Sequence, residues 1–133
     1  MKNKEFFIEF YKTLCDIHNE HVFLFLTGKK LALNNKKVLP KTGTAFRILS
    51  QYFSERELGE IKINKYNFKK GEFLFKLENS IFKIERKRHS CATATGILAG
   101  FFENSYKSYT GAEETKCICN GDKYCEIKVK VLK

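Results

Sequence analysis

The sequence lacks most features that would set it apart from an ordinary globular protein. It has no Trp and one Pro among 133 residues. The N-terminus does not combine an apolar segment with a small-residue cleavage site, so no signal peptide is expected. The longest apolar run, VFLFL at residues 22–26, is too short to span a bilayer. We therefore expect a cytoplasmic protein with no membrane span.

Acidic residues are also scarce. The chain carries 15 Asp and Glu against 25 Lys and Arg, which gives a formal net charge of +10. Such an excess raises nucleic acid as a partner. The lysines are scattered between apolar positions, however, and this favours a solvated basic surface. A stretch that mixes basic and aromatic residues, KYNFKKGEFLFK at 65–76, keeps nucleic-acid binding open as an alternative function.

The composition supports a folded core: 43% of the residues are hydrophobic, and 13 are Phe. The length suits a single domain over residues 1–133. Apolar spacing predicts helices over about 4–26, 42–53 and 90–107, with a break at 27–43 between the first two. Gly96 and Gly100 share one stripe of the last helix, which indicates close contact with another backbone.

Two segments switch to the alternating pattern of β-strands. Residues 61–63 and 73–77 flank a turn at 69–71, and a second hairpin covers 111–119 and 124–131. The segment SIFKIERK at 80–87 either extends a strand or adds another. The predicted fold is α+β, a two-layer domain with a four-stranded antiparallel sheet covered by helices, in the order α-α-β-β-α-β-β.

The five cysteines need an explanation in a chain with no secretion signal, because cytosolic thiols stay reduced. Cys91, Glu114, Cys117 and Cys125 are separated by 23, 3 and 8 residues. Three thiolates and one carboxylate can complete a tetrahedral Zn²⁺ site, and four protein ligands favour a structural ion over a hydrolytic one. His89 is an alternative ligand or a partner to a ligand. The alternative is that the cysteines are buried and pack as small hydrophobes.

The parity of the first strand of the second hairpin bears on which carboxylate is the ligand. In a regular strand Glu113, Cys117 and Cys119 would share one face, and Glu114 would point to the other. A bulge near 114–116 would bring Glu114 to the face of Cys117. Without that bulge, Glu113 or Cys119 would replace Glu114 or Cys117 as a ligand.

Residues 91–129 resemble the C-terminal signature of the 4-vinyl reductase domain family. The matching positions are Cys91, Gly96 with Gly100, Glu114 with Cys117, and Gly121 and Asp122 with Cys125. The resemblance implies a fold shared with Golgi-transport tethering subunits. In aromatic-sensing transcription regulators that carry this domain, the matching three Cys and one Glu hold zinc. The resemblance therefore implies a structural zinc ion at Cys91, Glu114, Cys117 and Cys125.

The resemblance also implies a function. The family's domain is mostly a small-molecule sensor or carrier, with a hydrophobic or aromatic ligand bound between helices and sheet. No Gly-x-Gly-x-x-Gly turn or flavin signature is present, so we expect a binding module and no catalytic residues. The candidate pocket residues are Phe46, Leu49, Tyr52, Phe53, Phe73, Phe75 and Phe102. A reductase, or an accessory subunit of tetrapyrrole metabolism, is a further alternative.

The partners follow from the same resemblance. The full sensors join this domain to an ATPase and a DNA-binding domain, and the sequence ends at Lys133 without either. We therefore expect it to act alone, as a homodimer, or through a partner regulatory protein. The apolar seam of the predicted helix at 4–26 is the candidate dimer face. The matched motif does not identify the ligand.

Overall fold

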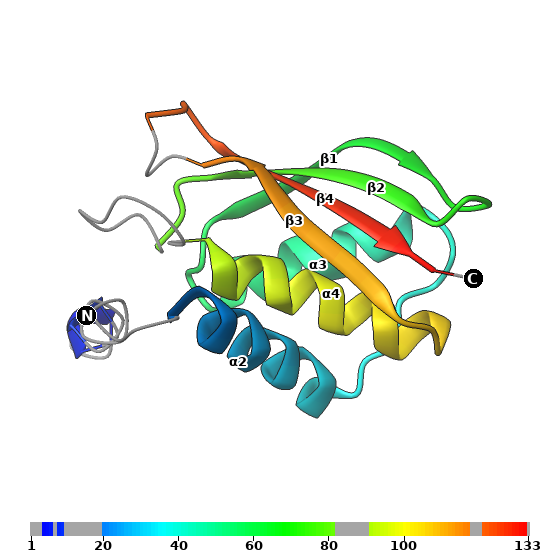
Figure 1. Cartoon of the computed structure of the whole chain (residues 1–133), viewed down its shortest axis with the longest axis horizontal. Helices are drawn as coiled ribbons and strands as arrows, with labels where there is room; N and C mark the ends of the chain where they lie inside the picture. The colour runs from blue at the N-terminus through cyan, green and yellow to red at the C-terminus, as the bar shows by residue number, and fades with distance from the viewer. Residues whose placement is uncertain (1–3, 7, 10–19, 82–90, 118–120, 133) are drawn as a thin grey trace.

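The computed structural model describes residues 4–6, 8–9, 20–81, 91–117 and 121–132 (Figure 1). Residues 4–6 and 8–9 are helical. The numbered elements that follow are α2 (Glu20–Asn35), α3 (Thr44–Glu55), β1 (Glu60–Asn67), β2 (Glu72–Glu78), α4 (Ala92–Tyr106), β3 (Thr110–Lys116) and β4 (Cys125–Val131). This order confirms the predicted α+β class. None of the described helices is long and apolar enough to cross a membrane.

The strands form one antiparallel sheet in the order β1-β2-β4-β3. Alternate residues of the two central strands, such as Phe75 and its neighbour Ile127, are buried on one face. The opposite face carries charged side chains, including an ion pair of 2.9 Å between Lys62 and Glu78. Because only one face is apolar, the helices cover only that face, as Figure 1 shows.

Helix α4 is the centre of the helical layer. Every residue from Ala92 to Phe102 is buried, since α4 contacts strands β3 and β4 and also helix α2. A helix enclosed in this way has no use for a polar stripe, and its sequence ATATGILAGFF has none. Helix α3 packs beside it and buries Leu49 and Phe53.

Helices α2 and α4 meet backbone to backbone, as the glycine stripe predicted. A methyl group at Gly96 would overlap the carbonyl oxygen of Phe25, and one at Gly100 would lie 2.6 Å from that of Lys29. The contact is reciprocal, because a methyl group at Gly28 would overlap the carbonyl oxygen of Thr93. Glycine is therefore required on both helices at this crossing.

This crossing corrects one prediction. The sequence placed a break over residues 27–43, but α2 continues through Gly28 to Asn35. Glycine inside a helix costs about 1 kcal/mol relative to alanine. Here the close packing that glycine permits offsets this cost, and spacing within a single helix cannot reveal that. The seam residues at 10–17 and the segment at 82–87 lie outside the described residues.

Candidate metal centre and adjoining groove

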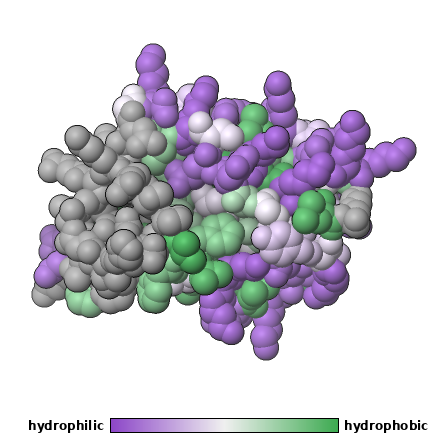
Figure 2. All heavy atoms as spheres, in the orientation of Figure 1, coloured by the Kyte–Doolittle hydropathy of each residue, from purple (hydrophilic) through white to green (hydrophobic). Residues whose placement is uncertain are grey.

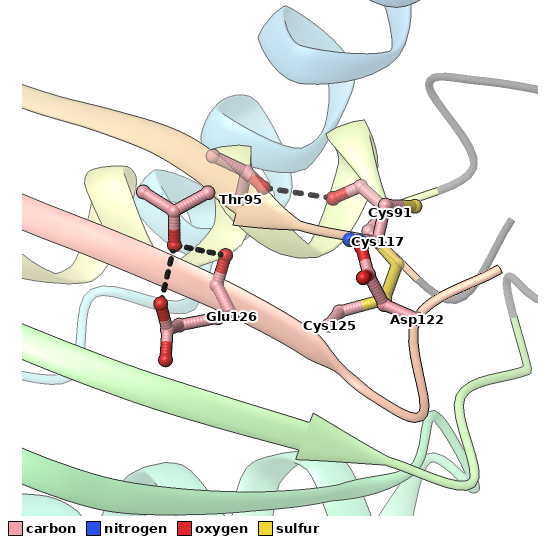
Figure 3. Close-up of a disulfide and its surroundings, with 7 residues drawn as sticks. Cys91, Thr95, Cys117, Asp122, Cys125 and Glu126 are labelled. Carbon is pink, nitrogen blue, oxygen red and sulfur yellow. Dashed lines mark hydrogen bonds between the residues drawn. A yellow bond between two sulfur atoms is a disulfide. The ribbon is translucent and has the colours of Figure 1, made fainter. Parts of the chain in front are cut away.

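Four side chains from separate elements converge at one end of the sheet. Cys91 is the N-cap of α4, Glu114 lies in β3, Cys117 follows β3, and Cys125 begins β4. Their ligand atoms all lie within 4.8 Å of one another. The three cysteines are buried, and Figure 3 shows their side chains directed toward a common point. The structure thus brings together the four residues that the sequence predicted as a zinc site.

A bulge in β3 decides which glutamate joins the cluster. The register of β3 against β4 shifts between Glu114 and Lys116, so Glu114 turns to the inner face with Cys117. Glu113 stays exposed, opposite Lys128. The predicted bulge is confirmed, and Glu113 is not in the cluster. The other alternative, Cys119, lies outside the described residues.

Hydrogen bonds fix the backbone beside two of the cysteines (Figure 3). The Thr95 hydroxyl and the Thr95 amide each donate to the Cys91 carbonyl over 2.9 Å. The Cys117 amide donates to the Asp122 carboxylate over 2.9 Å, and the Asp122 amide donates to the Cys117 carbonyl over 3.3 Å. Gly121, at φ +96°, permits this turn. Sequence reasoning did not predict the supporting role of Thr95, although its position four residues after Cys91 was a signal.

The Glu114 carboxylate is the member of the cluster with an unmet need. Its Oε2 is buried and accepts no hydrogen bond from any part of the chain that the structure describes. Burial raises the pKa of this carboxyl, and a hydrogen bond from the Cys117 thiol partly opposes the shift. An unsatisfied buried oxygen costs about 1–3 kcal/mol, and a bound cation would reduce that cost.

The sulfur atoms of Cys91 and Cys125 are bonded in the structure, a disulfide that the sequence did not predict. Their Cα atoms are 7.2 Å apart. Disulfides rarely bridge Cα atoms more than about 7 Å apart. Ligands of one zinc ion have no such limit, and their donor atoms lie within about 4 Å of one another. The spacing, the thiol-rich donor set and the orphaned Glu114 oxygen all fit a zinc ion.

The seven predicted pocket residues belong to the hydrophobic core. All are buried except Phe46, which is half-buried against it. Four of them form one aromatic cluster, in which the Phe73 and Phe102 rings lie 4.4 Å apart and the Phe46 and Phe75 rings 6.1 Å apart. Tyr106, which the sequence did not single out, joins this cluster 6.1 Å from Phe102. Among the described residues its buried hydroxyl has no hydrogen-bond partner.

A hollow of about 420 Å³ adjoins the metal cluster, between α2, α4 and β3. We call it the α2–β3 groove. Its lining residues are Val22, Phe25, Leu26, Ala92, Thr95, Ala112, Glu113 and Glu114. Figure 2 shows hydrophobic side chains exposed in the band between the sheet and α2. Glu114 belongs to both the groove and the cluster, so the two sites share a side chain.

Comparison with known proteins agrees with this geometry. Residues 83–131, which hold the whole cluster, match the model of the vinyl-4-reductase (V-4-R) domain. The chain carries a vinyl-4-reductase domain. A curated relative, an uncharacterized protein of Methanocaldococcus jannaschii, is 30% identical over 87 residues, covering 64% of this chain and 46% of the relative. The chain therefore spans about half the length of that relative.

Solved structures with the fold of the vinyl-4-reductase domain cover almost the whole chain. The phenol-responsive sensory domain of the transcription activator PoxR, solved with phenol, has a TM-score of 0.78 at 13% identity and covers 96% of this chain and 74% of its own. A vinyl-4-reductase family protein from Methanocaldococcus jannaschii gives 0.64 at 19%, covering 96% and 78%. Trafficking protein particle complex subunit 3 from Naegleria fowleri, covalently bound to palmitic acid, gives 0.62 at 15%, covering 98% and 96%. At these identities the likeness shows the fold.

Proposed function

We propose that residues 1–133 form a single small-molecule-binding domain with a structural zinc ion, acting in the cytoplasm as a sensor or carrier. The zinc ligands would be Cys91, Glu114, Cys117 and Cys125. The observation that carries the proposal is the buried convergence of these four donors beside an apolar groove. Four protein ligands leave no open coordination position for water, so the ion would stabilise the fold and not hydrolyse a substrate.

The zinc ion would join elements that are distant in sequence. Cys91 sits at the N-terminus of α4, where the helix dipole favours a thiolate, while Cys117 and Cys125 belong to the β3–β4 hairpin. A shared ion would fasten the start of α4 to that hairpin. Because α4 also carries the contact with α2, the metal would hold the helical layer and the sheet in one arrangement.

The ligand we propose is a small hydrophobic or aromatic molecule. Support comes from the fold neighbours, since the PoxR domain was solved with phenol and the trafficking subunit with palmitic acid. Two regions of this chain are chemically suited to such a molecule. One is the aromatic cluster around Phe73, Phe102 and Tyr106, and the other is the α2–β3 groove.

Native mass spectrometry of the protein, purified from cells without added metal, tests this function. We expect one zinc ion per chain and an additional small-molecule mass that is lost on denaturation. A metal-free protein with no adduct, whose thermal stability no hydrophobic or aromatic compound raises, would contradict the proposal.

We also propose a homodimer or a complex with a partner regulatory protein. Helix α2 leaves Phe23 and Leu31 exposed by 56% and 47%, and exposed apolar side chains of this size are typical of contact surfaces. Sedimentation velocity at micromolar concentration should show a species of twice the chain mass. A monomer alone would count against the homodimer and leave the partner protein to be sought.

Nucleic-acid binding is a second candidate, supported by one observation. The Tyr66 ring is 58% exposed at the end of β1, where Lys65, Lys69 and Lys70 lie close in sequence, and it packs 5.0 Å from the Phe46 ring. Exposed rings among lysines can stack on single-stranded bases. Binding to a single-stranded oligonucleotide that weakens steeply with salt, and that Tyr66→Ala reduces, would favour this function.

A further inference from the structure

We infer that the α2–β3 groove is a binding site for a small molecule with an apolar body and a hydrogen-bond-donating end, and that a protonated amine suits it best. The inference rests on the proposed function and adds the place and the chemistry of the ligand. The volume of about 420 Å³ falls within the range of small-molecule pockets.

The apolar part of the site comes from two helices and a strand. Val22, Phe25 and Leu26 line it from α2, Ala92 from α4, and Ala112 from β3. Val22 and Leu26 are 49% and 55% exposed, so the groove opens to the surface along α2. Covering these two side chains would remove apolar area from water, at about 25 cal/mol for each Å².

The polar part of the lining offers acceptors only. The Thr95 hydroxyl already donates to the Cys91 carbonyl, and the remaining polar side chains are the carboxylates of Glu113 and Glu114. The Glu114 Oε2 is buried without a hydrogen-bond partner among the described residues. A zinc ion held through one oxygen of this carboxylate leaves the second oxygen as an acceptor. A ligand that donates a hydrogen bond would satisfy that oxygen, whereas a ligand carboxylate would meet like charge.

The metal centre strengthens this preference. Three thiolates and one carboxylate around a divalent ion leave a net charge of about −2 beside the groove. No Lys or Arg belongs to the groove lining. A protonated amine is therefore favoured over a neutral alcohol, and both are favoured over a carboxylate.

Three ligands of matched shape test the inference: benzylamine, benzyl alcohol and benzoate. Each is titrated into the zinc-containing protein while amide chemical shifts are followed by NMR. We expect benzylamine to bind at least about 10-fold more tightly than benzoate, with benzyl alcohol between them, because each tenfold step equals about 1.4 kcal/mol. The largest shifts should fall on α2, the first turn of α4, and β3. Equal affinity for benzylamine and benzoate would overturn the inference.

Substitutions on α2 locate the site. Val22→Ser and Leu26→Ser should each weaken benzylamine binding by about fivefold, because each removes apolar lining. Leu31→Ser is the matched control, since Leu31 is 47% exposed on the same helix but does not line the groove, and it should leave binding unchanged. All three side chains are exposed, so the fold should survive, and the zinc content should stay the same.

The outcomes separate this inference from the proposed function. A co-purified small molecule that Leu26→Ser retains in full, with no effect of either groove substitution on benzylamine, would overturn the groove and leave the domain a small-molecule binder. Failure of all three ligands to bind would also overturn the groove. Absence of both a zinc ion and any small-molecule binding would overturn the proposed function itself.

Discussion

Asp122 is exposed, yet its carboxylate fixes the position of a buried residue. It accepts a hydrogen bond from the Cys117 amide over 2.9 Å and so closes the turn between Cys117 and Cys125. Groups that orient metal ligands typically contribute about 10-fold to 100-fold to metal affinity. The role of Asp122 would be positioning, because Asp122 is not one of the four converging donors.

Replacing Asp122 should therefore weaken zinc binding without removing a ligand. We expect Asp122→Ala to lower zinc affinity by about 10-fold, measured by competition with a chelating dye. Lys123→Ala is the control, since Lys123 is an exposed neighbour in the same turn and should leave affinity unchanged. Equal affinities in the two variants would show that the turn does not need the Asp122 carboxylate.

At the scale of elements, the contact between α2 and α4 depends on glycine. A methyl group at Gly28 would overlap the Thr93 carbonyl oxygen, and backbone cannot move aside as a flexible side chain can. We expect Gly28→Ala to lower the free energy of unfolding by about 2 kcal/mol, although alanine is the better helix former. Denaturant unfolding followed by circular dichroism measures the change.

Gly43 supplies the comparison for that prediction. It is the N-cap of α3, has φ −57°, and a methyl group there would contact nothing within 4 Å. Gly43→Ala should change the unfolding free energy by less than about 0.5 kcal/mol. If Gly28→Ala is as stable as Gly43→Ala, the two helices are free to separate without cost.

The elements also show what the sequence could and could not predict. Local alternation predicted both hairpins, and the parity conflict at Glu114 predicted the bulge in β3. The extent of α2 was not predictable, because Gly28 resembles a break until its contact with α4 is known. The α2–β3 groove was missed for the same reason: its lining comes from three elements whose proximity is set by packing and not by spacing.

At the scale of the whole molecule, zinc would join the helical layer to the sheet. Binding energy at a site formed only on folding adds to stability. Removing zinc with a chelator should therefore lower the thermal midpoint by about 10 °C. Cys91→Ser, which lacks one ligand, should show little response to the same chelator. A wild-type midpoint that ignores the chelator would mean that the fold does not rely on metal.

The most direct test of the account is the zinc content of two neighbouring variants, Glu113→Gln and Glu114→Gln, after equilibration with a competing chelator. The structure places Glu114 in the buried cluster and leaves Glu113 exposed. The account predicts that Glu113→Gln keeps about one zinc ion per chain, as the wild type does, and that Glu114→Gln loses most of it. Equal zinc in both variants, or none in the wild type, would contradict it.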